Sequence, residues 1–246
     1  MTTQRSWPKT VLGLVLTGIM LFPVYWMVNV SFTRDRDMRK TPPDLFPVHG
    51  TLDGYRAVLD RQLPFLGTSL LIALGTVALT LAIAAPAGYS LAKLRPIGGA
   101  AVRWLLLVAQ MIPAIIMAMG FYAIYLSLGV LNTIGGLIVA DATIDGAGSV
   151  RTFWSVILPV SRNATITVAL FAFLWAWSDF IFASTLDGGG RLRPITLGIY
   201  HYIGHNNQQW NAIMATAVVA SIPATVLLVV AQRYIASGVT AGTVKD

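Results

Sequence analysis

Long apolar runs alternate along the chain with shorter stretches of polar, glycine and proline residues. A helix needs about 20 mainly apolar residues to cross a hydrocarbon core about 30 Å thick. Five runs meet this requirement: about 10–32, 68–92, 104–126, 163–186 and 212–235. A sixth run, about 130–142, is too short to cross by itself. The pattern predicts an all-α fold, a polytopic bundle of transmembrane helices in one domain over residues 1–246.

The first run has the charge order of a secretory signal peptide, because the short segment before it is basic. Signal peptides, however, have apolar cores of about 7–15 residues that end at a small-residue cleavage site. The run 10–32 is longer, contains Pro23, and is followed by the charged segment 34–37. We therefore interpret it as the first membrane span.

Composition supports a membrane protein and removes several classes of function. Hydrophobic residues make up 56% of the 246 positions and charged residues 11%, against about 25% charged in a typical soluble domain. The chain has no cysteine, and its three histidines lie in no metal-binding motif, so we expect no disulfide and no metal site. The net charge of +7 comes from Lys and Arg between apolar runs, which favours lipid headgroups over nucleic acid as partners.

The most specific segment lies between the short run and the fourth long run. Its members are Asp145, Gly146, Ala147, Gly148, Phe153, Ile157, Leu158 and Pro159. Gly146 permits a sharp turn, and Asp145 can cap the helix that follows. The three large apolar members offer that helix an apolar face for a groove in a partner protein.

This segment resembles the second half of the EAA loop of ABC importer permeases. Further stretches resemble the carbohydrate-uptake branch of that family, which includes the smaller maltose permease subunit. They are 87–93, 111–113, 129–133, 173–180 and 232–242. The resemblance covers nearly the whole chain in the family's order.

The resemblance implies a MetI-like fold with six spans in the bacterial inner membrane. It implies that the loop at about 141–162 is cytoplasmic and couples to ATPase subunits, and that Gly238, Gly242 and Lys245 in the C-terminal tail contact them. The expected partners are a second permease, a pair of ATPases, an extracytoplasmic solute-binding protein and a sugar (mono-, di- or oligosaccharide). ATP and Mg belong to the ATPases, since this chain has no phosphate-binding GxxxxGK[ST] loop, so we expect neither a cofactor nor enzyme activity here.

One part of the family pattern is missing. The Glu-Ala-Ala half of the loop falls by spacing on Ala140, Asp141 and Ala142, with the acidic residue misplaced. Five spans would also put this loop and the N-terminus on opposite sides, whereas both are cytoplasmic in the family. Lys and Arg do not settle orientation, because the two sets of loops hold nine and eight of the 17. We infer that about 25–30 residues, roughly one helix and half a loop, are absent between about Val139 and Asp145.

Five residues in the fourth long run are candidates for the substrate pathway. They are Trp175, Trp177, Ser178, Asp179 and Phe180. An ionisable group such as Asp179 inside a span either faces a cavity or partner, or lies near the interface bonded to a neighbour such as Ser178. The two tryptophans lie on different helix faces, where each either stacks on a sugar ring or serves packing.

Three other functions stay open from the sequence. The chain could be an ABC permease for another small solute, such as a polyamine or a phosphate ester. An ion-coupled secondary transporter needs intramembrane carboxylates or repeated halves, and Asp179 is the one clear carboxylate. A purely structural membrane subunit is the third alternative.

Overall fold

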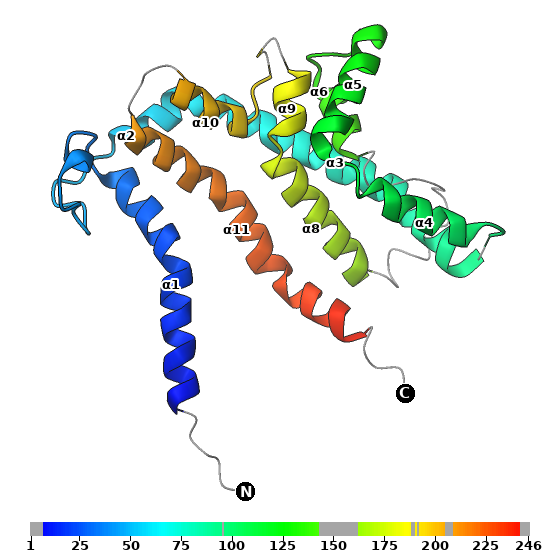
Figure 1. Ribbon diagram of the computed structural model, residues 1–246, viewed down its shortest axis with the longest axis horizontal. Helices are drawn as coiled ribbons and strands as arrows, with labels where there is room; N and C mark the ends of the chain where they lie inside the picture. Colours follow the sequence, from blue (N-terminus) through cyan, green and yellow to red (C-terminus); the bar gives the residue numbers. More distant parts are fainter. Residues whose placement is uncertain are drawn as a thin grey trace, which may run out of the picture. The chain divides into compact units, whose positions relative to one another are not determined.

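The computed structural model describes residues 7–94, 96–142, 162–187, 190, 192–204 and 209–241, and the regular elements in these ranges are helices joined by turns and loops (Figure 1). The helices are α1 (Trp7–Phe32), α2 (Asp53–Ala57), α3 (Leu63–Tyr89), α4 (Gly99–Ala109), α5 (Ala114–Leu128), α6 (Ile134–Ala142), α8 (Arg162–Ser178), α9 (Ile181–Leu186), α10 (Ile195–Gly204) and α11 (Trp210–Ala241). No strand occurs in these described ranges. The structure therefore confirms the predicted all-α class.

Three helical segments among the described residues are long and apolar enough to cross a membrane. They are Trp7–Phe32, Asp53–Tyr89 and Trp210–Gln232. Most side chains of α1 are exposed. Lipid or a partner subunit must cover such a helix, because an apolar surface of this length is stable only away from water.

The prediction of one continuous span over 104–126 differs from the structure. α4 and α5 replace it, and their axes are bent by 99° at the break between them. Pro113 begins α5 in an extended conformation, with φ −58° and ψ 132°. Proline has no N–H for the preceding turn and its ring disfavours helix before it, so the apolar run is interrupted there.

The structure divides into two compact units. Unit 1 comprises Met1–Leu63 and His201–Ser221, and unit 2 comprises Pro64–Tyr200 and Ile222–Asp246. In unit 1 the N–H of Asn211 donates to the Asp35 carboxylate at 3.2 Å, which joins the loop after α1 to the start of α11. The hydroxyls of Ser31 and Tyr55, 2.8 Å apart, join α1 to α2.

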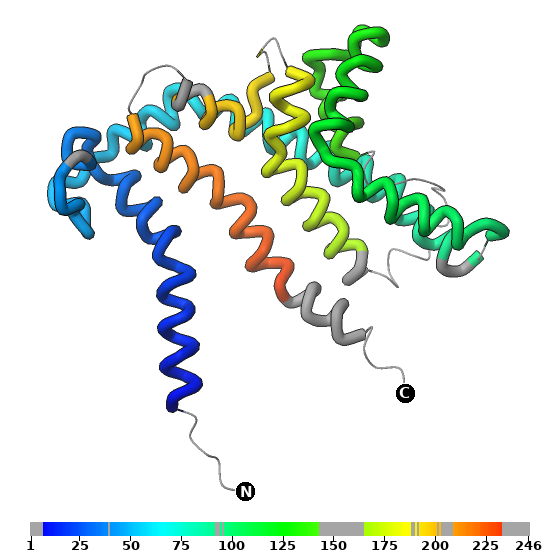
Figure 2. Tube along the Cα trace, viewed as in Figure 1, coloured from blue at the N-terminus to red at the C-terminus, as the bar shows by residue number. Residues whose placement is uncertain are grey.

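Unit 2 has its main core where α3, α5, α6 and α9 meet. Buried members of this core include Ile72, Ala118, Leu137 and Phe182. Figure 2 shows α5, α6 and α9 close together, and both α5 and α6 contact α9. The Tyr125 hydroxyl donates to the Gly136 carbonyl at 2.9 Å, so α5 and α6 are also joined by a hydrogen bond.

Two hydrogen bonds show which helix ends lie together in unit 2. The N–H of Asn132 donates to the Leu186 carbonyl at 3.1 Å, so the start of α6 lies beside the end of α9. The N–H of Ile195 donates to the Ser69 hydroxyl at 2.8 Å, close to the start of α3. The described part of α6 has nine residues, about 14 Å of helix, which is less than half of a core of about 30 Å.

Gly54 is the tightest point of unit 1 and gives a test of its packing. A Cβ there would lie 2.6 Å from the Asn211 carbonyl oxygen. We expect Gly54→Ala to cost about 1–3 kcal/mol through this overlap, although alanine is intrinsically the better helix former. Thermal unfolding of the purified protein measures the loss.

Gly67→Ala is the matched control, because Gly67 is also helical but has nothing within 4 Å of its added Cβ. It should unfold at the parent temperature or slightly above. Equal unfolding temperatures for the two variants would show that α2 and α11 do not pack as described.

Candidate functional site

Asp179 lies at the break between α8 and α9, inside the predicted span 163–186. Its carboxylate accepts the N–H of Phe182 at 3.2 Å and that of Ala183 at 2.9 Å. These are first-turn amides of α9, which have no partner within the helix. Its carbonyl accepts the Thr196 hydroxyl at 2.7 Å. Asp179 therefore caps α9 and joins it to α10.

Of the two alternatives left open for Asp179, a hydrogen bond to its neighbour Ser178 is not the one that the structure shows. The Ser178 hydroxyl instead donates back to the Leu174 carbonyl at 2.8 Å and to the Trp175 carbonyl at 3.2 Å. A serine that bonds to the preceding helical turn satisfies itself locally. Because α8 ends at Ser178, the carboxylate of Asp179 is free to accept the N–H groups of α9.

The same carboxylate borders a small polar cavity in unit 2. Asp141, Ser69 and Pro194 are among its other lining residues, and its volume is about 10 Å³. Asp141 is only 3% exposed, and its Oδ1 has no hydrogen-bond partner in the described part of the chain. A cavity of this size holds about one water molecule, so in this conformation it is too small for a sugar.

The two tryptophans of α8 differ in exposure, as expected for different helix faces. Trp175 is 56% exposed, whereas Trp177 is 7% exposed and stacks on Phe173 with ring centroids 5.4 Å apart. Phe180 is 37% exposed and its ring packs on Tyr200 at 5.3 Å. Of these side chains, Trp175 has the most surface free for a ligand.

The residues expected to couple to the ATPases lie mainly outside the described residues. These are Asp145, Gly146, Ala147, Gly148, Phe153, Ile157, Leu158, Pro159, Gly242 and Lys245. Gly238 lies within α11. Asp141, placed by sequence at the start of the coupling loop, is instead buried near the end of α6 together with Ala140 and Ala142. These three residues belong to a packed helix and offer no docking surface.

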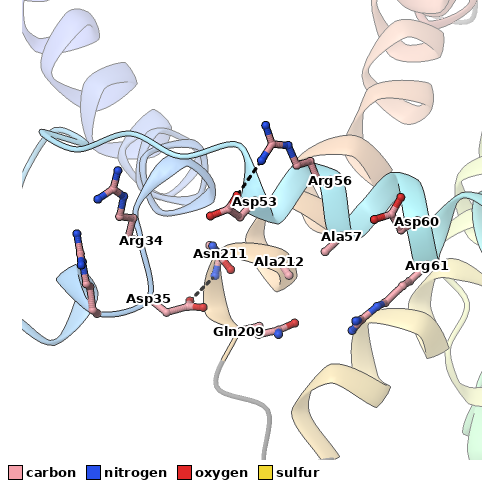
Figure 3. Close-up of a pocket in the computed structure, with 11 residues that line it drawn as sticks. Arg34, Asp35, Asp53, Arg56, Ala57, Asp60, Arg61, Gln209, Asn211 and Ala212 are labelled. Atoms are coloured by element: carbon pink, nitrogen blue, oxygen red, sulfur yellow. Dashed lines mark hydrogen bonds and ion pairs between the residues drawn. The ribbon is translucent and has the colours of Figure 1, made fainter.

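Unit 1 contains a charged pocket that the sequence did not predict (Figure 3). It has a volume of about 540 Å³, and arginines and aspartates from the loop after α1 and from 53–61 surround the start of α11. Asp53 pairs with Arg56 at 3.3 Å, with both side chains at least two-thirds exposed. Such exposed pairs contribute about 0–1 kcal/mol. The Asp53–Arg56 pair therefore contributes little to the stability of unit 1.

The sequence contained one signal for this pocket, the charged segment 34–37 after the first span. By itself this charged segment indicates only where the first span ends. Asp35 meets Asn211 across 176 positions of the chain, and Figure 3 shows Arg61 directed toward Gln209. Contacts over such distances in sequence arise only from the tertiary fold.

Comparisons with known proteins cover nearly the full chain. Residues 3–241 match the family described as "Binding-protein-dependent transport system inner membrane component". The trehalose/maltose transport system permease protein MalG of Thermococcus litoralis is 30% identical, over 96% of this chain and 95% of its own. The diacetylchitobiose uptake system permease protein DasC of Streptomyces coelicolor is 26% identical, over 98% and 97%.

A solved structure has a similar fold. It is a bacterial ABC transporter involved in the import of the acidic polysaccharide alginate. The TM-score is 0.73 with 17% sequence identity, and the match covers 96% of this chain and 99% of the other. At this identity the similarity supports the fold alone.

In each sequence alignment, a similar number of positions in the relative has no counterpart in this chain. The alignment with MalG has 267 positions, whereas 96% of 246 residues is about 236, which leaves about 31 positions without a counterpart here. The alignment with DasC has 269 positions, and 98% of 246 is about 241, which leaves about 28. These totals agree with the absent segment of about 25–30 residues inferred from the sequence.

The role of Asp179 as a cap can be tested by hydrogen exchange. We expect Asp179→Ala to accelerate exchange of the Phe182 and Ala183 amides by roughly 5- to 30-fold, because losing a cap costs about 1–2 kcal/mol. Asp179→Asn keeps one acceptor oxygen and should retain much of the protection. Mass spectrometry of exchanged peptides from 181–186 provides the measurement.

Ser184→Ala is the control, since Ser184 is exposed on α9 and only donates to the carbonyl three residues earlier. It should leave exchange unchanged. If Asp179→Ala also leaves exchange unchanged, the carboxylate does not hold the start of α9.

Proposed function

This chain belongs to the family of binding-protein-dependent transport system inner membrane components, and we propose that it is the permease subunit of an ATP-driven saccharide importer. The match to that family over residues 3–241 carries the proposal. Relatives named for trehalose/maltose and diacetylchitobiose transport align over nearly their whole length. The saccharide as cargo comes from these relatives.

The partners follow from the same proposal. A second permease completes the pathway, a pair of ATPases binds ATP and Mg, and an extracytoplasmic binding protein delivers the saccharide. Closure of the ATPases on ATP would move the coupling loop and tilt the spans between inward-facing and outward-facing states. Because this chain has no phosphate-binding loop, the energy enters through that contact.

The orientation in the membrane is also part of the proposal. We assign the loop between α1 and α3 and the start of α11 to the extracytoplasmic end. The turn at 96–98 and the C-terminal end of α11 then face the cytoplasm with the ATPases. The contact between Asp35 and Asn211 supports this assignment, because it brings the end of α1 and the start of α11 to one end of unit 1.

The same family membership explains why α6 is short. A helix needs about 20 residues to cross, so α6 requires about 11 more. The 28–31 unmatched positions of the relatives, if placed after Ala142, would supply those residues. Roughly 17–20 would then remain for the missing first half of the coupling loop. We propose that the gap lies at this point.

Affinity purification of the tagged full-length chain in mild detergent tests the function. We expect an ATPase, a second permease and a solute-binding protein to accompany it. Proteoliposomes of the complex should take up trehalose or maltose only when ATP is supplied on the ATPase side. Uptake that continues without ATP but stops when an ion gradient collapses would instead identify a secondary transporter.

The position of the gap has its own test. We expect insertion of the unmatched MalG segment, about 31 residues, after Ala142 to increase several-fold the ATPase recovered with the chain. The inserted residues would complete a span and restore both halves of the docking loop. A hydrophilic linker of equal length is the control and should give no increase. Loss of recovery with the MalG segment would show that the gap lies elsewhere.

A further inference from the structure

Unit 1 contains a second pocket, between the end of α1 and the start of α11, that has a different chemical character. Its volume is about 280 Å³, and its lining includes two tryptophans, Trp26 and Trp210. The polar lining residues are Asn29, Thr33, Asp37 and Asp44. Small-molecule sites are mainly apolar with a few placed polar groups, and have volumes of roughly 300–1,000 Å³. This pocket lies near the lower limit.

The two tryptophans offer different surfaces. Trp26 stacks on Phe22 of its own helix, with ring centroids 6.1 Å apart and planes inclined by 25°. Trp210, the first residue of α11, is 49% exposed. No ring stacks on Trp210 in the described part of the chain, so a face of its indole is open to a ligand. The bond between the next residue, Asn211, and Asp35 fixes the backbone that carries it.

Asn29 provides an unsatisfied acceptor in the wall of the pocket. The residue is 4% exposed, and its Nδ2 donates to the Asp44 carbonyl at 3.2 Å. Its Oδ1 is buried and has no partner among the described residues. A buried acceptor without a donor costs about 1–3 kcal/mol. Because this oxygen is not accessible, Asn29 serves the pocket by holding Asp44 in place through its Nδ2.

The two carboxylates of the pocket share one cation. Lys40 Nζ lies 3.1 Å from Asp37 Oδ1 and 3.1 Å from Asp44 Oδ2. The hydrogen bond from Lys40 holds the pKa of Asp37 below its usual range. Asp37 is therefore ionised at neutral pH and accepts hydrogen bonds. Lys40 offsets one of the two negative charges and holds both carboxylates in place, so they can accept hydrogen bonds from the hydroxyls of a neutral ligand.

We propose that this pocket binds a single ring of a neutral saccharide. The apolar C–H face of the ring would stack on Trp210, and ring hydroxyls would donate to the carboxylates of Asp37 and Asp44. Stacking on an aromatic face combined with fixed polar acceptors distinguishes such a ring from a lipid chain. The assignment rests on the proposed function, since a saccharide must be the cargo.

Titration of the full-length chain in nanodiscs with glucose, maltose and trehalose tests this proposal. Calorimetry and tryptophan fluorescence report binding. We expect Trp210→Ala to weaken affinity about tenfold, a loss of about 1.4 kcal/mol, and Trp210→Phe to weaken it less than about threefold. Trp7→Ala is the control, because Trp7 is 64% exposed at the other end of α1. It should bind like the parent.

Asp37→Asn separates a ligand contact from a structural role. The variant keeps the size of the side chain and loses its charge, and because the pair with Lys40 is partly exposed it should unfold near the parent temperature yet lose several-fold in affinity. Unchanged affinity in both Trp210→Ala and Asp37→Asn would overturn the proposal. So would absence of binding of all three sugars to the parent, or displacement of bound sugar by spermidine.

Failure of this inference is distinguishable from failure of the proposed function. ATP-driven uptake of maltose by the complex that is equal in the parent and in Trp210→Ala would overturn the pocket assignment and leave the importer in place. A complex that takes up no saccharide with ATP would overturn the proposed function. Binding isotherms of the nanodisc protein are measured without ATP and do not depend on that assay.

Discussion

A membrane interior supplies no water to satisfy backbone N–H and C=O groups, so the protein must provide every partner itself. This constraint explains the side chains found at two interruptions of the helices. Where the chain leaves α8, the carboxylate of Asp179 takes the free amides of α9. Where α10 begins, the Ser69 hydroxyl accepts the N–H of Ile195. The polar residues within the apolar runs are therefore first of all partners for interrupted backbone.

The same constraint ties the architecture of unit 2 to its cavity. Capping α9 draws Asp179 toward the interior, where it meets the end of α6 and the buried Asp141. Asp141 is a second buried carboxylate, and its Oδ1 has no partner among the described residues. Such a group is unusual in a membrane helix. The described part of α6 ends at Ala142, next to this carboxylate. On our proposal, this is also where the relatives have additional residues.

Unit 1 follows a different principle, because its polar groups lie at the ends of spans. Asp35 reaches Asn211, and Gly54 permits the close approach of α2 to the backbone of α11. The residues of the first contact line the charged pocket. The second pocket, lined by two tryptophans, is formed by the neighbouring end of α1 and start of α11.

The sequence by itself determined the membrane class, the positions of the apolar runs and the lack of a phosphate-binding loop. These features depend on local composition and on helix length, which are read directly from consecutive residues. It also indicated the family through the ordered stretches from 87 to 242, and the absent segment through the short run at 130–142.

Only the tertiary structure decided the bend between α4 and α5, the partner of Asp179, and the two pockets of unit 1. In lipid, the packed and the exposed faces of a helix are both apolar, so periodicity does not identify the face that makes contacts. Ser178 and Asp179 are adjacent in the sequence, yet they bond to different helices. Which side chains meet depends on helices brought together from distant parts of the chain, and no local pattern contains that information.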